Sequence, residues 1–360
     1  MEVLRYLQSN TLETLNSEYS IKVKEYPEHN IAVLNYNQID SPKYHPIVME
    51  CRGLIINTKT LTVVSRTFQR FFNLNENEND LFDFESGFRA EEKADGSIMS
   101  VYHHNDSWHI ASRGSAFAEG TTALGMTFKE MFETIIGTDI NTYMGDRHTS
   151  HSYTFEMCSM ANKVVKIYKE PCLYLLNIYD LELNMEYGVD TLDLVAEQLN
   201  VKRPVVYDVE SVEDIRESFK DFEPTEEGYV LIDVNRNRIK VKNPAYVDLH
   251  HMKGNGEITP KRIADVVFRG ESKEILSYFP EFKEIFRPWE EAYESLINNI
   301  DEWSHLLGEP ELSQKAFAIS IQKLHFKGIL FSMRKGLTME ASFDKMGKNS
   351  KVVLLEYYIN

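Results

Sequence analysis

The apolar residues of this chain follow two different spacings, and the change from one to the other falls near residue 250. Before it, short apolar or alternating runs are separated by turn residues, which is typical of antiparallel strand pairs. After it, apolar residues recur at helical spacing from Thr259-Pro260 onward. The pattern predicts an α+β domain over residues 1–250 and an all-helical domain over residues 251–360, joined at the Lys-Gly-Asn-Gly sequence of residues 253–256.

Local signals give more detailed expectations. Thr121 is expected to cap a helix that runs through Ile136 and ends at Gly137. Residues 164–168 are expected to form a strand, because three of the five are the β-branched residues Val164, Val165 and Ile167. In the last hairpin of the first domain, residues 239 and 241 are apolar while residues 240 and 242 are lysines. A strand would therefore send the two lysines to one face and the apolar pair to the other.

Composition limits the environment of the protein. Hydrophobic residues make up 42% of 360 residues, and no apolar run approaches the roughly 20 residues of a membrane helix. No basic and then apolar leader is found. The three cysteines, Cys51, Cys158 and Cys172, follow no metal-binding or redox spacing. We expect a cytoplasmic protein with reduced thiols and no membrane partner.

The net charge of −17 argues against indiscriminate binding of nucleic acids, because phosphate contacts need clustered cations. Any role on nucleic acid must therefore depend on local basic patches. One candidate lies between Lys315 and Lys351, where eight Lys and Arg residues accompany two acidic residues. The same stretch is equally typical of a solvated helical face.

Lys93 opens a Lys-Ala-Asp-Gly sequence that directly follows a strand-like run. Asp-Gly favours a turn, so the segment is also typical of an ordinary surface turn. A lysine acts as a nucleophile only when it is neutral. For a reference pKa of about 10.4, losing the proton near neutral pH costs about 4 kcal/mol. Nearby cations would lower that cost.

Groups that could serve Lys93 follow later in the chain: Glu156 in a strand-like run, Glu227 before the last hairpin, and Lys240 and Lys242 within it. Neither a P-loop nor a Gly-x-Gly-x-x-Gly sequence occurs, so side chains would have to bind any phosphates. Two lysines on one strand face repel each other unless an anion lies between them. The alternative is that they cover a solvated outer face.

The order and spacing of Lys93-x-Asp-Gly, Glu156, Glu227-Gly and Lys240-x-Lys242 resemble the covalent nucleotidyltransferase superfamily of ATP-dependent ligases and capping enzymes. Over most of residues 1–250 the chain is most similar to the phage-type RNA ligase 1 family. If a phage encodes the protein, we expect it in the host cytoplasm. The resemblance implies an antiparallel-sheet nucleotidyltransferase fold and two cofactors, ATP and Mg²⁺ or Mn²⁺. It also implies that Lys93 attacks the α-phosphate of ATP, that AMP passes to an RNA 5′-phosphate, and that a 3′-hydroxyl then displaces AMP.

The resemblance also implies roles for single residues. Lys240 and Lys242 would contact the α-phosphate, and Glu227 would help to hold metal beside Lys93. The other nucleotide contacts would be Tyr36, Arg52, Arg70, Arg113, Glu156 and, for adenine stacking, Leu176 or Tyr174. Two positions depart from the family pattern. Arg113 stands where some relatives have lysine, and Lys273 stands where an acidic metal ligand is expected, which leaves Glu274 as the candidate ligand of the helical domain.

In related enzymes a helical cap is associated with recognition of structured RNA, so nicked tRNA is the expected partner of residues 251–360. A DNA ligase or a capping enzyme would share Lys93, Glu156, Glu227 and the lysine pair. Both usually carry a β-barrel OB domain after the last lysine motif, whereas this sequence predicts helices. A non-catalytic ATP-binding assembly factor is a further alternative. It would bind nucleotide without turnover, and the intact lysines argue against it.

Overall fold

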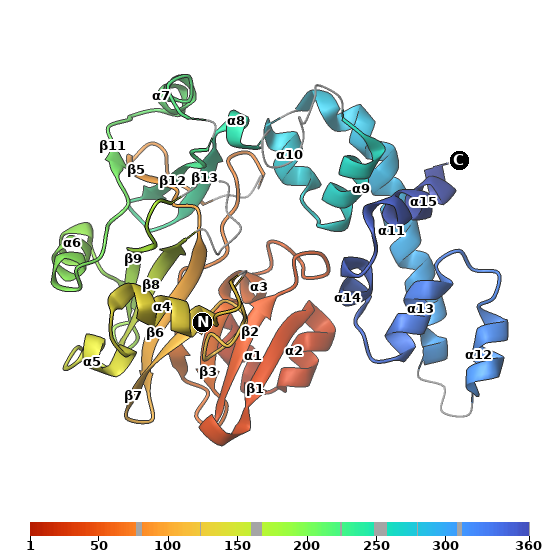
Figure 1. Cartoon of the computed structure of the whole chain (residues 1–360), viewed down its shortest axis with the longest axis horizontal. Coiled ribbons are helices and arrows are strands. Elements are labelled where there is room, and N and C mark those ends of the chain that lie inside the picture. The colour runs from red at the N-terminus through yellow and green to blue at the C-terminus, as the bar shows by residue number, and fades with distance from the viewer. Residues whose placement is uncertain are drawn as a thin grey trace. The chain divides into compact units, whose positions relative to one another are not determined.

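A computed structural model describes residues 1–76, 81–122, 124–159, 168–223, 225–247, 258–278, 280–307 and 312–359. The chain divides into two compact units, Met1–Tyr246 and Val247–Asn360. The first unit contains three sheets whose neighbouring strands are antiparallel (Figure 1). In the described residues of the second unit, every regular element is a helix.

The first sheet has the order β1-β2-β3-β4, with β1 at Ile21–Tyr26, β2 at Ile31–Tyr36, β3 at Arg52–Asn57 and β4 at Val63–Ser65. The helices α1 (Glu2–Leu7), α2 (Leu12–Tyr19) and α3 (Pro46–Glu50) share a core with it that contains Leu15, Leu34 and Ile56. This core fixes the ends of β2 and β3, where Tyr36 and Arg52 lie.

The second sheet has the order β10-β9-β8-β6-β7. Its strands are β6 (Ser97–His104), β7 (Ser107–Ser112), β8 (His151–Cys158), β9 (Cys172–Asp180) and β10 (Met185–Glu186). The helices α4 (Phe128–Ile136), α5 (Ile140–Met144) and α6 (Val189–Gln198) share its main core, which includes Phe132, Phe155 and Leu192. A separate cluster around Val33, Ile55 and Tyr102 joins this sheet to the first.

The third sheet has the order β11-β5-β12-β13, with β5 at Phe88–Glu92, β11 at Val206–Tyr207, β12 at Gly228–Asp233 and β13 at Arg238–Lys242. The helix α7 (Val212–Ser218) packs against it through Ile215, and α8 (Pro244–Val247) follows β13. The segment before the first gap runs along β13, because Leu74 N–H donates to Lys240 O (2.8 Å) and Lys240 N–H donates to Phe72 O (2.9 Å).

The predicted start of the helix after residue 120 is wrong. α4 begins at Phe128, and its N-cap is Thr127, which forms a capping box with Glu130. Thr121 instead forms an isolated bridge with Thr127. The predicted end at Gly137 is confirmed, since this residue adopts a left-handed conformation there. The strand expected at 164–168 falls largely on residues outside the described part, and so does the joint at 253–256.

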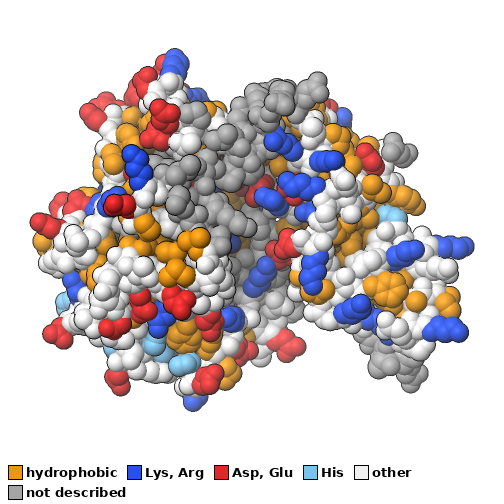
Figure 2. Space-filling view, in the orientation of Figure 1, with side chains coloured by type: hydrophobic (Ala, Val, Ile, Leu, Met, Phe, Trp, Pro, Cys, Tyr) orange, Lys and Arg blue, Asp and Glu red, His pale blue; other side chains and the backbone are white. Residues whose placement is uncertain are grey.

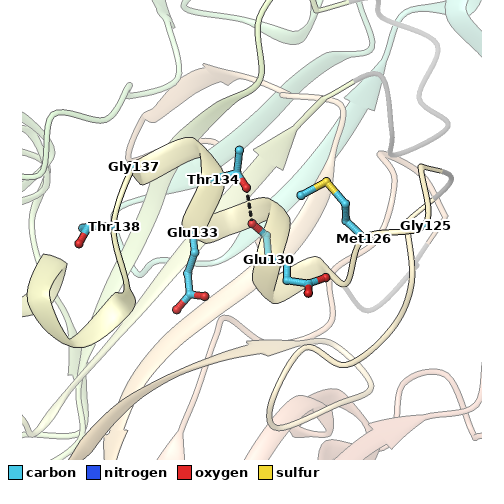
Figure 3. A pocket seen from close by; sticks show the side chains of 7 residues that line it. All are labelled: Gly125, Met126, Glu130, Glu133, Thr134, Gly137 and Thr138. Atoms are coloured by element: carbon cyan, nitrogen blue, oxygen red, sulfur yellow. Dashed lines mark hydrogen bonds between the residues drawn. The ribbon is translucent and has the colours of Figure 1, made fainter.

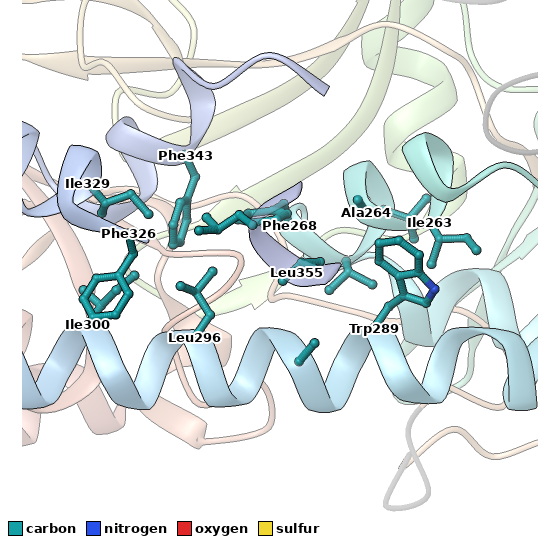
Figure 4. Close-up of a cluster of buried hydrophobic side chains, with 14 of the residues drawn as sticks. Ile263, Ala264, Phe268, Trp289, Leu296, Ile300, Phe326, Ile329, Phe343 and Leu355 are labelled. Atoms are coloured by element: carbon teal, nitrogen blue, oxygen red, sulfur yellow. The ribbon is translucent and has the colours of Figure 1, made fainter. Parts of the chain in front are cut away.

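The second unit consists of α9 (Pro260–Phe268), α10 (Ser272–Tyr278), α11 (Lys283–Ser304), α12 (Gln314–Ser320), α13 (Lys327–Arg334), α14 (Met339–Asp344) and α15 (Lys348–Ile359). As predicted, Thr259 is the N-cap of the first helix. One face of α11 carries Trp289, Leu296 and Ile300 at helical spacing. Trp289 lies beside Ile263 and Ala264 of α9, and Ile300 lies beside Phe326 and Ile329 (Figure 4). None of the described helices has the length and apolar character needed to cross a membrane.

Candidate active site

Lys93 lies immediately after β5, and neighbouring strands fix its position. Its N–H donates to Gly228 O (2.8 Å), which ties the Lys93 loop to β12. A Cβ on Gly96 would lie 2.4 Å from Met157 O, so only glycine lets the loop lie this close to β8. The Asp-Gly sequence is thus a point of contact between two sheets, which an isolated surface turn would not need.

The Lys93 amine forms a short ion pair with Glu227, with Nζ 2.6 Å from Oε2. The other oxygen of the same carboxylate lies 3.6 Å from Lys242 Nζ. Glu227 is buried, and Gly228 beside it has φ +128° and leaves no room for a Cβ against Val241 O. One carboxylate therefore lies between two of the lysines that the sequence predicted to act together.

The alternation predicted for β13 is confirmed. Ile239 and Val241 are buried in the core of the third sheet, whereas Lys240 and Lys242 are only partly buried on the opposite face. Lys240 Nζ lies 5.5 Å from the centre of the Phe71 ring. The lysine pair consequently faces the cluster around Lys93 and Glu227 and leaves the core apolar.

Glu156 lies on β8, opposite Ile98 of β6, and its charge is poorly compensated. Burial raises the pKa of this carboxyl to about 7. Lys93 and Arg52 oppose the shift, while the neighbouring carboxylates Glu227 and Asp95 add to it. A cation among these carboxylates would favour the ionised form of Glu156.

Arginines surround Tyr36 at the end of β2. The guanidinium of Arg70 lies 4.0 Å above the Tyr36 ring and that of Arg113 lies 5.4 Å above it. Gly53, with φ +69°, allows the start of β3 to approach Arg113, because a Cβ there would lie 3.1 Å from its backbone. Burial opposes ionisation of the Tyr36 hydroxyl, but Arg113, Arg52, Arg70 and Lys240 outweigh it and lower the pKa.

Two of these arginines have unused hydrogen-bonding capacity. Nη1 of Arg52 and Nη1 of Arg70 are buried and have no hydrogen-bond partner among the described residues. Burial lowers the pKa of both guanidinium groups. Buried cationic donors are costly unless they are paired, so an anion with several oxygens, such as a polyphosphate, fits them.

The two candidates for adenine stacking belong to one small cluster. Tyr174 is buried together with Ala94, Cys158 and Tyr168, and Leu176 packs against this group while remaining partly exposed. Tyr168 accepts a hydrogen bond from Asp95 N–H (3.0 Å). Both candidates therefore lie close to the Lys93 loop, and the greater exposure of Leu176 favours it as the stacking surface.

The two predicted metal ligands, Glu227 and Glu274, belong to different units of the chain. Glu227 belongs to the Lys93 cluster, while Glu274 is on α10 of the second unit, where its backbone carbonyl accepts a hydrogen bond from Ser277 (2.7 Å). Among the described residues, no three His, Cys, Asp or Glu side chains form a ready-made metal site. Mg²⁺ commonly binds through one or two carboxylates and substrate phosphates, so Glu227 and Glu156 fit such a site only together with a nucleotide.

Sequence reasoning missed Arg238 and two phenylalanines. Arg238 shares a strand face with Lys240 and Lys242, and this period of two was the signal that could have found it. Its guanidinium lies 4.6 Å from the Phe68 ring, and Arg52 lies 4.8 Å from the same ring. Phe71, 5.5 Å from Arg52, carried no such signal.

A separate hollow at α4 lacks the chemistry for phosphates (Figure 3). It is lined by Gly125, Met126, Glu130, Glu133, Thr134, Gly137 and Thr138, with no Lys or Arg among them. Glu130 is already used in the capping box of the helix. Figure 3 shows the Thr134 side chain turned back onto the Glu130 carbonyl, to which it donates (2.7 Å).

The cations of residues 315–351 are not all exposed. Lys351 is buried against Asp265 (3.3 Å), and the Arg334 guanidinium lies 4.3 Å from the Phe317 ring. Lys and Arg side chains of the second unit are dispersed over the visible face in Figure 2. The exposed members of the stretch are Lys315, Lys323, Lys327, Lys335, Lys345 and Lys348.

Lys93 beside a buried carboxylate, the Lys240 and Lys242 pair, and two arginines whose buried Nη1 atoms have no hydrogen-bond partner among the described residues form a cluster suited to binding the phosphates of a nucleotide. Residues 50–246, more than half of the chain, match the model of a family described as RNA ligase. The chain belongs to this RNA ligase family, and the predicted phage-type RNA ligase 1 resemblance is confirmed.

Two relatives and one solved structure illustrate the similarity. The chain is 30% identical to a protein of Autographa californica nuclear polyhedrosis virus named as a bifunctional polynucleotide kinase/RNA ligase, over 100% of this chain but 53% of that protein. It is 23% identical to the RNA ligase of Rhodothermus phage RM378, over 98% of this chain and 97% of that one. An archaeal ATP-dependent RNA ligase shares the fold, with a TM-score of 0.51 and 12% identity over 81% of this chain and 74% of that chain.

Proposed function

We propose that the protein is an ATP-dependent RNA ligase that joins 5′-phosphate and 3′-hydroxyl RNA ends through a lysyl-AMP and an RNA-adenylate. The observation that carries the proposal is the Lys93–Glu227–Lys242 arrangement, in which one buried carboxylate contacts the candidate nucleophile at 2.6 Å and a second lysine at 3.6 Å. Membership of the RNA ligase family supports RNA rather than DNA as the substrate.

The residues have complementary roles in this proposal. Glu227 is positioned to accept the proton that the Lys93 amine must lose before it attacks the α-phosphate. Lys240 and Lys242 stabilise the charge that develops on the transferring phosphoryl group. The remaining triphosphate oxygens are bound by Arg52, Arg70 and Arg113. Glu156 contacts the ribose or a neighbouring group, and Leu176 stacks on adenine.

A divalent cation, Mg²⁺ or Mn²⁺, would be held by Glu227 and phosphate oxygens, and it would supply charge neutralisation around the α-phosphate. The raised pKa of Glu156 supports this, because a nearby cation relieves the crowding of carboxylates around it. In the second unit we propose Glu274 as a metal ligand.

For the substrate we propose RNA with a 5′-phosphate and a 3′-hydroxyl, and in particular nicked tRNA. One relative is named as a bifunctional polynucleotide kinase/RNA ligase, and a kinase produces the 5′-phosphates that such a ligase consumes. In this proposal residues 1–250 are sufficient for adenylylation, and residues 251–360 select the structured RNA.

The test is incubation with ATP labelled at the α-phosphate. We expect label that survives denaturation of the protein and is lost in acid, as a phosphoramidate should be. Lys93→Ala should take up no label, whereas the matched surface change Lys129→Ala should behave as the parent. Equal labelling of Lys93→Ala and the parent would exclude the proposed nucleophile. Sealing assays on RNA and DNA strands of one sequence then separate an RNA ligase from a DNA ligase.

A further inference from the structure

A pocket of about 480 Å³ adjoins the Tyr36 arginine cluster within the first unit. It is formed by α3, the segment after β4, the edge strand β10 and the turn between β12 and β13. Four arginines line it, together with aromatic rings: Arg66, Arg70, Arg236 and Arg238, with Tyr44, Phe68, Phe71 and Phe72. Its size lies within the range of about 300–1,000 Å³ of small-ligand pockets, so it can hold a nucleotide.

The two carboxylates of this pocket are already engaged. Glu50 accepts the N–H groups of Glu2 (3.0 Å) and Val3 (2.9 Å) at the start of α1. Glu186 forms a bidentate pair with Arg238, with N–O distances of 3.1 and 2.6 Å. Among the cations, Arg238 is therefore neutralised, and the remaining arginines give the pocket a positive charge.

Arg66 and Arg70 supply that charge. Neither has a carboxylate within ion-pair distance in the part of the chain that the structure describes. Arg66 donates to the Tyr179 hydroxyl (2.7 Å) and stacks on the same ring (4.6 Å). Arg70 is only 4% exposed, and its Nη1 has no hydrogen-bond partner among the described residues. A buried donor without a partner indicates a ligand that supplies an acceptor.

The pocket is continuous with the candidate active site. Arg70 lines the pocket and also lies 4.0 Å above Tyr36. Phe71 lines the pocket and lies 5.5 Å from both Arg52 and Lys240. A strand bound in the pocket would therefore lead directly to the arginines proposed to bind the triphosphate.

The proposed reaction requires the RNA 5′-phosphate to approach from one particular side of the α-phosphorus. In the first step Lys93 Nζ bonds to the α-phosphorus while the bond to pyrophosphate breaks on the opposite side, as in-line displacement requires. In the second step an oxygen of the RNA 5′-phosphate bonds to the same phosphorus, the Nζ–P bond breaks, and the amine recovers a proton. The incoming oxygen must approach opposite Nζ, which is the side that pyrophosphate has left.

We infer that the pocket binds the first nucleotide of the 5′-phosphorylated RNA strand, with Arg66 and Arg236 at its phosphates and Phe71 or Phe68 against its base. This inference rests on the proposed function. Arginines that alternate with aromatic side chains commonly bind single-stranded RNA, because each base offers a face for stacking. Arg70, which lines the pocket and belongs to the proposed triphosphate site, would contact the RNA 5′-phosphate after pyrophosphate has left.

The test uses the full-length protein in its labelled lysyl-AMP form, mixed with a 5′-phosphorylated single-stranded RNA whose 3′ end is blocked. Arg66→Ala and Arg236→Ala should each slow single-turnover AMP transfer about tenfold at subsaturating RNA, since each loses a contact to a charged group. The dependence of RNA binding on salt should weaken by about 0.7 in log–log slope for each arginine removed. Self-adenylylation should be unchanged, and Arg216→Ala, an exposed arginine on α7, should match the parent in both steps.

Each other outcome has a distinct meaning. A parent protein that takes up no label contradicts the proposed function itself. If the parent transfers AMP and both arginine variants do so equally fast, only the pocket assignment is overturned. The same holds if Arg216→Ala is as slow as the two pocket variants. If self-adenylylation of the variants falls together with AMP transfer, the pocket binds ATP, and its assignment to RNA is overturned as well. Should Arg66→Ala fail to fold, Arg236→Ala decides, because it changes a partly exposed side chain on a turn.

Discussion

Two charged clusters, one in each unit, satisfy their charges in opposite ways. In the second unit the carboxylate of Asp265 contacts three cations: Arg269 and Lys348 at 3.1 Å each and Lys351 at 3.3 Å. In the first unit Glu156 is crowded by other carboxylates, and Arg52 and Arg70 each have a buried Nη1 that lacks a partner within the described residues. Burial raises the pKa of both carboxyls, but the three cations outweigh it at Asp265, where the pKa is lowered.

The difference separates charges that hold the fold from charges that await a ligand. A carboxylate whose charge is compensated within its own unit contributes to packing and orientation there, and it offers little to a partner. An incompletely compensated network costs free energy in the free protein and recovers it when a complementary ion binds. Lys348 and Lys351 therefore serve mainly the helical core, whereas Arg52, Arg70 and the lysine pair serve a substrate.

The largest effect is expected when the Asp265 charge of the second unit is removed. Asp265→Asn leaves Lys351 buried without its countercharge, so the free energy of unfolding should fall by about 4 kcal/mol. Denaturant unfolding followed by fluorescence measures this, since Trp289 lies in the core of the second unit. Asp344→Asn, at an exposed position of α14, is the matched control. Equal stability of Asp265→Asn and the parent would show that the network is no structural clamp.

Glu156→Gln is expected to change how the free energy of unfolding depends on pH. The folded pKa of Glu156 is raised to about 7 from an ordinary value of 4.5, so the folded state binds its proton more tightly than the unfolded state does. Its contribution to stability is present below pH 4.5 and is lost as the pH rises to 7. Relative to the parent, Glu156→Gln should therefore gain about 3 kcal/mol between pH 4.5 and pH 8.

The measurement is the free energy of unfolding of both proteins across this range, with the exposed Glu28→Gln as a control. The opposite sign applies to Asp265, whose lowered pKa gives a contribution that is lost as the pH falls through the folded value. A difference between Glu156→Gln and the parent that stays constant with pH would show that folding does not raise the pKa of this carboxyl.

Lys242→Ala tests whether the lysines around Glu227 are needed for self-adenylylation but not for the stability of the fold. Its side chain lies on the face of β13 opposite the core, so far-UV circular dichroism and the unfolding midpoint should stay close to the parent. Self-adenylylation should fall about 100-fold, which corresponds to about 2.7 kcal/mol of lost phosphate stabilisation. Unfolding of the variant or full uptake of label from α-labelled ATP would each refute this assignment.

The sequence predicted those features that depend on local periodicity or on a short motif. The alternation of residues 239–242 and the lysine at the end of β5 both belong to this class. The helix start at Thr121 failed for a local reason, because Thr127 with Glu130 three residues later is the stronger capping signal. A correct choice between the two threonines was available from the sequence.

Other features could not be predicted because their parts are distant in the chain. The arginine pocket combines residues from α3, the segment after β4, β10 and the turn before β13, and no local pattern relates them. The burial of Lys351 depends on Asp265, which is 86 positions away. A count of cations between residues 315 and 351 therefore overestimated the charge that is available to RNA.

The smallest expected effect concerns the exposed lysines of the second unit. We expect the triple change of Lys315, Lys323 and Lys335 to Glu to leave adenylylation intact and to reduce sealing of a nicked anticodon stem-loop about tenfold, with little effect on single-stranded RNA. Truncation after residue 256 should remove the same preference. A triple change of exposed lysines in the first unit, Lys22, Lys59 and Lys129, controls for net charge. If the truncated protein kept the full preference for the stem-loop, selection of structured RNA would belong to the first unit, and the exposed cations of the helical unit would only be a solvated face.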